Sequence, residues 1–182
     1  MKYIALFGGS FDPPHLGHVA VVEALLQRED IEKIIVMPTY LNPFKFESVA
    51  PSSLRLKWLR DIFSSYENVV ISDYEVNQNK KVPSIQSVDY LLQNNKNLYL
   101  VIGADNLKSF DKWYKYEELI TKVKVIIASR NSIAVNDTFT LLHVSEDVSS
   151  TALRKDMNIS KLPQKCAKEI FHYYKEKNAK KS

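Results

Sequence analysis

The chain opens with a short apolar run, residues 3–7, that leads through two glycines into a helical pattern. In an α/β sheet, a strand, a glycine-rich turn and a helix in this order present backbone N–H groups and a helix N-terminus to a phosphate. His15 and His18 stand three residues apart in this segment, so on a helix their side chains lie on one face, about 5–6 Å apart. Residues 8–18 therefore predict a phosphate site directly after the first strand. An ordinary strand-to-turn junction is the alternative for the two glycines taken alone.

Apolar runs alternate with helical patterns over the rest of the sequence. The runs are rich in Val and Ile and nearly continuous in apolarity, which is typical of strands covered on both faces. We therefore expect right-handed βαβ units and a Rossmann-like, doubly wound α/β fold, with a mainly parallel sheet and helices on both faces. The expected strands are residues 3–7, 33–37, 69–72, 98–102, 123–128 and 140–144. The expected helices are residues 19–27, 53–63 with a serine cap before it, 87–93 and 117–121, and a last helix that opens at Pro163.

Composition limits the class of protein. A chain of 182 residues, 45% hydrophobic and 25% charged, is long enough for one well-buried domain and short for two, so we expect a single domain over residues 1–182. No segment approaches the roughly 20 consecutive apolar residues of a membrane span, and the apolar run at the start is too short for a signal peptide. Cys166 is the only cysteine, which suits a reducing compartment. We therefore expect a cytoplasmic protein without membrane contact.

The net charge of +4 could indicate a nucleic-acid partner. Much of the excess lies in a short basic C-terminal tail, residues 175–182, which is typical of a solvated helix end. Aromatic residues and lysines are not interleaved as they are in a surface that binds single strands. We therefore expect no nucleic-acid partner, whereas a modest positive field suits anionic nucleotides. The sequence leaves the oligomeric state open.

A second polar cluster, Ser149, Ser150, Thr151 and Arg154, follows the last expected strand. Its hydroxyl residues open a short helical pattern, so they supply an N-cap together with free N–H groups, or a cap alone. In a doubly wound sheet the carboxyl ends of the parallel strands face one ligand crevice. Polar motifs follow five of the six expected strands, so we expect these loops to meet at one site.

Residues 8–18 resemble the His-x-Gly-His signature of nucleotidyltransferases, and residues 148–154 resemble the Ile-Ser-Ser-Thr-x-x-Arg motif of the same superfamily. Within it, the chain is most similar to the bacterial nicotinate-nucleotide adenylyltransferases, and the similarity covers essentially its whole length. Further stretches that fit this family, in the expected order, are Met37-Pro38, Pro43-Phe44-Lys45, Gly103-Ala104-Asp105 and Trp113-Tyr114.

The resemblance implies transfer of the adenylyl group of ATP to nicotinate mononucleotide, giving nicotinate adenine dinucleotide and pyrophosphate. The second pKa of a phosphate monoester is about 6, so the attacking phosphate is already ionised and the reaction needs positioned donors rather than a general base. We expect Mg²⁺ on the phosphates of ATP and no fixed protein ligand, since no carboxylate cluster resembles a metal cage. The alternatives are transfer to nicotinamide mononucleotide or another phosphorylated acceptor, and a nucleotide sensor without turnover.

The residues expected in catalysis are His15, His18 and Arg154. Those expected at ATP are the same three together with Gly8, Gly9, Ser10, Phe11, Gly103, Asp105, Ser149, Ser150 and Thr151. Those expected at the acceptor are Lys45, Asp105, Trp113 and Arg130. The plain alternatives for the acceptor residues are a solvated charge for Lys45, a helix N-cap for Asp105, packing for Trp113 and an ion pair for Arg130.

Two places depart from the family pattern. Phe44 stands where a histidine is usual, and residues 83–91 replace a Ser-Tyr-Thr-x-x-Thr run. Side-chain contacts to substrate from these places are therefore left open, whereas backbone contacts survive such changes.

Overall fold

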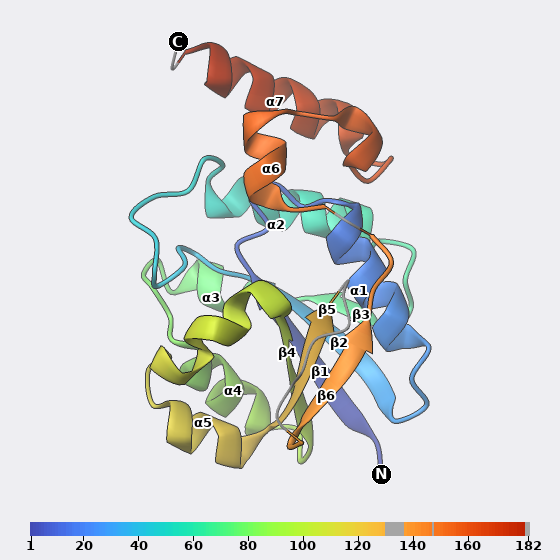
Figure 1. Cartoon of the computed structure of the whole chain (residues 1–182), viewed down its shortest axis with the longest axis vertical. Coiled ribbons are helices and arrows are strands. Elements are labelled where there is room, and N and C mark those ends of the chain that lie inside the picture. Colours follow the sequence, from blue (N-terminus) through green and yellow to red (C-terminus); the bar gives the residue numbers. More distant parts are fainter. Residues whose placement is uncertain (130–136, 147, 181–182) are drawn as a thin grey trace.

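The computed structural model describes residues 1–129, 137–146 and 148–180. These ranges hold one sheet of six parallel strands in the order β3-β2-β1-β4-β5-β6, with helices on both sides (Figure 1). The strands are β1 (Tyr3–Gly9), β2 (Ile31–Pro38), β3 (Val69–Ile71), β4 (Leu98–Gly103), β5 (Lys124–Ser129) and β6 (Phe139–His143). The α-helices are α1 (Leu16–Leu26), α2 (Ser52–Ile62), α3 (Tyr74–Asn77), α4 (Ser84–Leu92), α5 (Tyr116–Lys122), α6 (Ser150–Lys155) and α7 (Ala167–Ala179), and the 3₁₀-helices are η1 (Ala104–Lys112) and η2 (Ile159–Lys161). The expected doubly wound α/β fold is confirmed.

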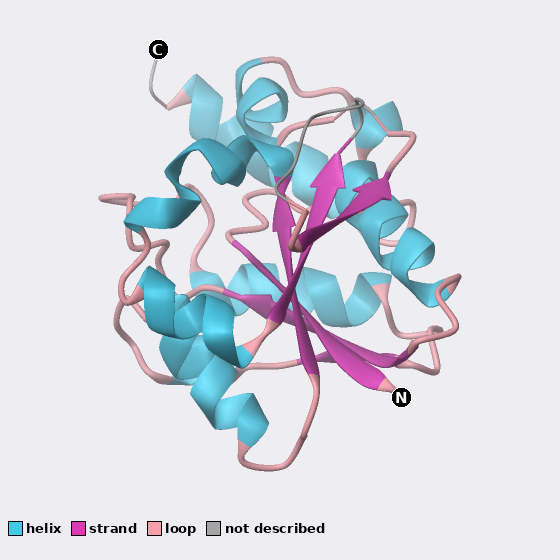
Figure 2. Ribbon diagram, turned by 60° about the horizontal axis from the view of Figure 1, so that its bottom comes forward, coloured by secondary structure: helices cyan, strands magenta, loops and turns pink. Residues whose placement is uncertain are grey.

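The sheet is buried on both faces because successive side chains of a strand point to opposite sides. In β1, Ala5 and Phe7 join a core with α1, α2 and α7 on one face, whereas Ile4 and Leu6 join a core with α4, α5 and η1 on the other. Alternate residues of β2, β4 and β5 divide in the same way. Figure 2 shows the helices on either side of the strands. This double cover explains why the strand segments are almost continuously apolar.

The order of the strands reverses between β1 and β4. From β1 the chain proceeds to β2 and β3 on one side, and from β4 it proceeds to β5 and β6 on the other. At such a switch point the connections leave two neighbouring strands in opposite directions and open a crevice beyond their carboxyl ends. Gly9 ends β1 and Gly103 ends β4, so both glycine-bearing loops flank this crevice.

Several local expectations differ from the structure. The last helix begins at Ala167 rather than at Pro163, because residues 164–166 form a turn. The expected serine cap of α2 is wrong, since its N-cap is Pro51 and no side chain bonds to the helix end. The basic segment 175–182 continues α7 as far as Ala179, as expected of a helix end. No helix in the described ranges is long and apolar enough to cross a membrane.

The helical segments η1 and α3 have no counterpart among the expected helices. In and beside η1, Leu107, Phe110 and Trp113 recur every three residues and pack into the core that contains α4 and α5. Three residues are the period of a 3₁₀-helix rather than of an α-helix. This packing fixes η1 beyond the carboxyl end of β4, at the edge of the crevice.

Candidate active site

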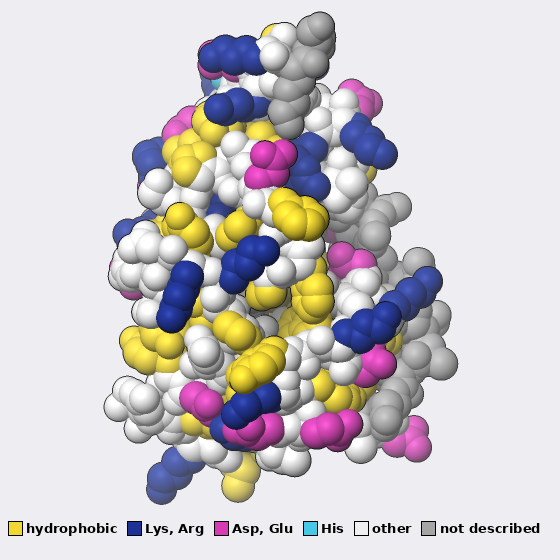
Figure 3. Space-filling view, turned by 90° about the vertical axis from the view of Figure 1, so that its left-hand side faces the viewer, with side chains coloured by type: hydrophobic (Ala, Val, Ile, Leu, Met, Phe, Trp, Pro, Cys, Tyr) yellow, Lys and Arg dark blue, Asp and Glu magenta, His cyan; other side chains and the backbone are white. Residues whose placement is uncertain are grey.

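A cavity of about 900 Å³ opens at the crevice between β1 and β4. Its walls come from the loops after β1, β2, β4 and β6, from η1, and from α3 and the start of α4. Its volume falls in the range of small-molecule sites, about 300–1,000 Å³. On the face shown in Figure 3, hydrophobic side chains gather around the hollowed middle of the molecule, with Lys and Arg side chains among them.

The expected site residues come together in this cavity. The loop after β1, the histidine pair and the serine cluster all contribute to its lining, so the two ends of the sequence share one site. Arg130 lies outside the described residues. The expected residues that line the cavity are Gly8, Gly9, Ser10, Phe11, His15, His18, Lys45, Gly103, Asp105, Trp113, Ser149, Ser150, Thr151 and Arg154.

The histidine pair sits at the start of α1. His15 is the N-cap residue, and its ring stacks on that of His18 with the centroids 3.7 Å apart and the planes inclined by 25°. The rings are thus closer than the helical spacing alone indicates. A Cβ atom on Gly17 would lie 2.9 Å from Nδ1 of His15, closer than such contacts allow. Glycine at position 17 is therefore what lets the two imidazoles stack.

The hydrogen bonding of His18 fixes which of its nitrogens carries a proton. The backbone N–H of His15 donates to Nδ1 of His18 over 3.1 Å. Burial, and after it the neighbouring His15, lower the pKa of His18 well below 6.5, so the ring is neutral at pH 7. A neutral imidazole whose Nδ1 accepts holds its proton on Nε2. His18 thus offers one N–H donor without adding a positive charge.

The loop after β1 differs from the expected glycine-rich turn. Gly8 and Gly9 are the last residues of β1, and neither has a positive φ. The unusual conformation falls on Phe11, with φ of 48°, a region that bulky residues rarely adopt. Its ring is buried and packs edge-on against Phe7 and His18, with centroids 5.5 and 4.7 Å away. The aromatic contacts thus hold the turn that the glycines were expected to make.

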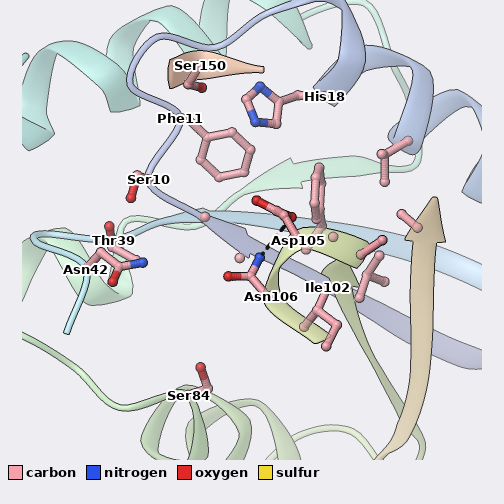
Figure 4. A pocket seen from close by; sticks show the side chains of 18 of the residues that line it. Ser10, Phe11, His18, Thr39, Asn42, Ser84, Ile102, Asp105, Asn106 and Ser150 are labelled. Atoms are coloured by element: carbon pink, nitrogen blue, oxygen red, sulfur yellow. Dashed lines mark hydrogen bonds between the residues drawn. The ribbon is translucent and has the colours of Figure 1, made fainter. Parts of the chain in front are cut away.

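The serine cluster is hydrogen-bonded directly to the first loop. The Ser149 hydroxyl caps α6 by accepting from the N–H of Ala152 over 3.1 Å, as expected. The Ser150 hydroxyl donates to the carbonyl of Pro13 over 2.9 Å, and the Arg154 guanidinium donates to the carbonyl of Asp12. Figure 4 shows Ser150 and His18 at the same end of the cavity. The two motifs therefore form one connected wall.

Arg154 also donates from Nη2 to the hydroxyl of Thr151 over 3.1 Å. Its two protein contacts use two of the five N–H donors of a guanidinium. The expected bidentate contact with phosphate oxygens therefore has donors left to make it. Asn178 of α7 donates to the Arg154 carbonyl over 3.0 Å, so the last helix supports this part of the wall.

Asp12 supports the site from behind the cavity wall, and sequence reasoning treats it only as part of a turn. Its carboxylate is buried and accepts hydrogen bonds from the N–H groups of Val49 and Ala50, over 2.8 and 3.0 Å, and from the hydroxyl of Tyr174. Burial and the carboxylate itself raise the pKa of Tyr174, so this hydroxyl stays protonated and donates. The side chain thus joins the loop after β1 to the loop before α2 and to α7.

Arg55 is the second residue that sequence reasoning misses. It is fully buried in α2 and donates to the carbonyls of Ala50, Ser10 and Tyr40 over 3.0, 2.5 and 2.8 Å. The signal is present in the sequence, because position 55 shares the apolar stripe of Leu59 and Ile62. A charge on the apolar stripe of a helix indicates a buried polar partner.

The expected acceptor residues lie in the cavity with different degrees of burial. Lys45 is half-buried, and its ammonium is 3.4 Å from the Ser10 hydroxyl. Burial, and after it the charge of Arg154, lower the pKa of Lys45. Asp105 is exposed and does not cap η1, whose N-cap is Gly103. Trp113 packs edge-on against Phe110, 5.0 Å between centroids, and also lines the cavity. Phe44 lines it too and is mostly exposed.

Glu75 and Ser87 form a buried polar pair that the sequence does not single out. Glu75 lies on α3 and Ser87 on α4, and the Ser87 hydroxyl donates to Oε1 of Glu75 over 2.6 Å. Burial raises the pKa of Glu75 to about 7, although the hydrogen bond from Ser87 acts in the opposite direction. Both residues line the cavity, so a carboxyl group that changes its charge near neutral pH belongs to the site.

The fold and the two joined phosphate motifs define a nucleotidyltransferase of the α/β class. The family described as cytidylyltransferase-like matches residues 6–156. Relatives from Sulfurimonas denitrificans and Campylobacter fetus are 55% and 41% identical, over 99% and 97% of this chain and 99% of each relative. Both carry the name "probable nicotinate-nucleotide adenylyltransferase". The chain therefore belongs to the nicotinate-nucleotide adenylyltransferase family.

Solved structures agree on the fold. The nicotinic acid mononucleotide adenylyltransferase of Plasmodium falciparum, complexed with NaAD, has a TM-score of 0.77 at 19% identity, covering 98% of this chain and 97% of that one. The same enzyme complexed with APC has a TM-score of 0.70, again at 19% identity, covering 98% and 96%. The expected fold class is thus confirmed, and the relatives named above confirm the expected family.

Replacing Tyr174 by Phe removes the hydroxyl that donates to buried Asp12 and should lower the free energy of unfolding by about 1–3 kcal/mol. Urea unfolding measures this difference. Tyr90→Phe is the matched control, because Tyr90 is 40% exposed and should change stability by less than about 0.5 kcal/mol. Equal stabilities of Tyr174→Phe and wild type would show that this contact does not hold α7 to the site.

Replacing Glu75 by Gln should alter the pH dependence of stability. The folded-state pKa of about 7 lies above the ordinary 4.5, so the folded protein keeps a proton that the unfolded chain releases. The stability that Glu75 contributes is therefore complete below about pH 4.5 and is lost as the pH rises to about 7, on the order of 3 kcal/mol in total. Glu75→Gln should gain stability over wild type across that interval in urea unfolding. The exposed Glu117→Gln variant should differ in stability from wild type by the same amount at every pH. A constant difference for Glu75→Gln as well would show that this carboxyl group is not buried as described.

Proposed function

We propose that the chain transfers the adenylyl group of ATP to the 5′-phosphate of nicotinate mononucleotide, releasing nicotinate adenine dinucleotide and pyrophosphate. The observation that carries this proposal is the hydrogen-bonded junction of the two phosphate motifs, in which Ser150 donates to the Pro13 carbonyl and Arg154 to that of Asp12. Membership of the adenylyltransferase family supports the same reaction.

We place the triphosphate of ATP at the end of the cavity that holds His18 and Ser150 (Figure 4). The donors there are the Nε2 proton of His18, the hydroxyls of Ser149 and Thr151, and the remaining guanidinium donors of Arg154. Together they neutralise the charge that grows on the α-phosphate and on the departing pyrophosphate. These groups are held before substrate arrives, because protein hydrogen bonds already fix His18 and Arg154.

In the proposed step, an oxygen of the acceptor phosphate attacks the α-phosphorus of ATP in line. The new P–O bond forms as the bond from the α-phosphorus to the bridging oxygen breaks, and the electron pair leaves with pyrophosphate. The attacking phosphate has a second pKa of about 6, so at pH 7 no side chain has to remove a proton. The protein contributes alignment of two polyanions and electrostatic stabilisation.

We place the acceptor toward η1 and the start of α4. Trp113 offers an aromatic face, which suits a cationic pyridine ring. Lys45 lines the cavity beside Ser10, where it can contact the acceptor phosphate. Asp105 is exposed, lines the cavity and can accept from ribose hydroxyls.

Mg²⁺ belongs to the proposal as a companion of ATP. The donors at the phosphate end are imidazole, hydroxyl, guanidinium and ammonium groups, which suit phosphate oxygens, whereas Mg²⁺ prefers oxygen ligands and keeps several waters. The donor set thus fits a metal ion that is carried by the phosphates. There Mg²⁺ would neutralise charge on the β- and γ-phosphates.

We also propose the cytoplasm as the site of this reaction. Cys166 is the only cysteine of the chain, so an internal disulfide does not form. Burial raises the pKa of its thiol to about 11, which makes it a poor nucleophile at pH 7.

A coupled assay of pyrophosphate release tests the function. It uses ATP, Mg²⁺ and a panel of acceptors: nicotinate mononucleotide, nicotinamide mononucleotide and phosphopantetheine. We expect the highest kcat/KM with nicotinate mononucleotide.

In the same assay, His18→Ala should lower kcat by roughly 10²–10³-fold, the usual effect of removing one donor to a transition-state charge. His172→Ala, on the exposed side of α7, should retain the wild-type rate. A near-normal rate of His18→Ala would remove the role assigned to this imidazole, and no release with any acceptor would reject the reaction.

Replacing Trp113 by Ala should separate the two substrates. Loss of the aromatic face should raise KM for nicotinate mononucleotide by roughly tenfold, whereas KM for ATP should change little. Initial-rate measurements with each substrate varied in turn distinguish these effects. Equal increases in both KM values would indicate that Trp113 supports the cavity as a whole rather than stacking on the acceptor.

A further inference from the structure

The end of the cavity away from the phosphate motifs contains a buried acid. In Figure 4, Ser84 lies at this end, opposite His18 and Ser150. Val82, Pro83 and Trp113 contribute to the lining together with Glu75. The walls here are mainly apolar, which suits a flat aromatic ring, and Glu75 is the polar group set among them.

One oxygen of Glu75 has a partner and the other does not. The side chain is 5% exposed, and Oε1 accepts from the Ser87 hydroxyl over 2.6 Å. Within the described residues, Oε2 has no hydrogen-bond partner. A buried polar atom without a partner is destabilising, so native proteins usually keep one only where a ligand or water completes it. The unpaired oxygen of a residue that lines a substrate cavity therefore indicates a ligand contact.

The bond to Ser87 also bears on where the acid proton sits. With the Ser87 hydroxyl donating to Oε1, the proton of the neutral acid is on Oε2, the oxygen that lacks a partner. Burial raises the pKa of this acid to about 7. Glu75 can thus be a donor or an acceptor within the physiological range.

The charged groups around α3 are engaged elsewhere. On the neighbouring α2, Lys57 pairs with Asp61 and Glu169, and Arg60 pairs with Asp73, which precedes α3. On α4, Asp89 pairs with Lys122. The remaining charged side chains of the cavity lining are Lys45, Asp105, Lys112, Glu146 and Arg154. None of these is a cause of the shift of the Glu75 pKa, which burial raises and the hydrogen bond from Ser87 lowers.

We propose that Glu75 is a specificity-determining residue that recognises the substituent on the pyridine ring of the acceptor. This rests on the proposed function. As a neutral acid, Glu75 donates from Oε2 to the carboxylate of the nicotinate group, a charge-assisted hydrogen bond. As a carboxylate, it repels that group and accepts instead from the amide N–H of a nicotinamide group. Ser87 is the positioning residue that keeps Oε2 as the donor.

This arrangement makes acceptor preference depend on pH. As the pH rises through about 7, Glu75 ionises in the free enzyme, so KM for nicotinate mononucleotide rises and KM for nicotinamide mononucleotide falls. The acceptor phosphate also titrates near pH 6, but it does so in both acceptors. The ratio of the two KM values therefore cancels the contribution of the phosphate and isolates the ring substituent.

The test compares wild type with Glu75→Gln from about pH 6 to about pH 8.5. The carboxamide keeps an acceptor for Ser87 and an N–H donor in the place of Oε2, but it does not titrate. For wild type, we expect the ratio of KM for nicotinate mononucleotide to KM for nicotinamide mononucleotide to rise at least roughly tenfold over this range. For Glu75→Gln the ratio should stay constant, with KM for ATP unchanged. Glu117→Gln, on the exposed side of α5, should follow wild type.

Glu75→Ala provides a second variant, since it removes the donor without adding another polar atom. Its KM for nicotinate mononucleotide should be raised at about pH 6, and its ratio of the two KM values should lose the wild-type pH dependence. A constant ratio for wild type, or an equal slope in wild type and Glu75→Gln, would overturn the inference. Wild type that releases no pyrophosphate with either acceptor would instead reject the proposed function, so the two failures are distinct.

Discussion

The buried carboxylate of Asp12 is the contact on which the phosphate end of the cavity depends. It fixes the turn out of β1 by accepting from the backbone of Val49 and Ala50 and from Tyr174 of α7. A buried carboxylate is tolerated only where hydrogen bonds and opposite charge replace water, and the Asp12 charge in turn acts on Arg55. The histidine segment begins three residues later. Its position is therefore set by parts of the chain far from it in sequence.

Cationic side chains lie near one another beside the phosphate motifs. Burial, and after it the charges of Arg154 and Arg55, lower the pKa of Lys45, although Asp12 and Asp105 act in the opposite direction; the effect of the two arginines is the sign of repulsion among cations. An anionic ligand relieves this repulsion, so part of its binding free energy is already present in the arrangement of the site. The histidines contribute differently. His18 is neutral and donates from Nε2, so it supplies a directed hydrogen bond without adding positive charge.

The sequence predicts those features of the fold that rest on local pattern. Strands covered on both faces are continuous apolar runs, and each observed strand lies within two residues of its expected bounds. The histidine and serine motifs lie next to strand ends, so the topology of a parallel sheet was enough to bring them together. Asp12, Arg55 and Glu75 could not be assigned in this way, because their partners come from other elements and depend on packing. Even the turn after β1 is set by the buried ring of Phe11 rather than by the glycines that mark it.

Under the proposed function, the two ends of the cavity bind negative groups by different means, and this difference separates the substrates. A fixed cation beside the pyridine ring would attract the carboxylate of nicotinate, but it would attract the phosphates of ATP as strongly and favour reversed binding. A buried neutral acid offers one directed hydrogen bond and no long-range electrostatic attraction. It can therefore bind the carboxylate of nicotinate, held against an apolar wall, without attracting the phosphates of ATP. Burial raises the pKa of Glu75 to about 7, so the neutral acid is present at and below neutral pH, and Ser87 on the neighbouring helix hydrogen-bonds to it. The short helix α3, which has no clear pattern in the sequence, is placed by packing, and in the proposed complex it brings this single group to the acceptor.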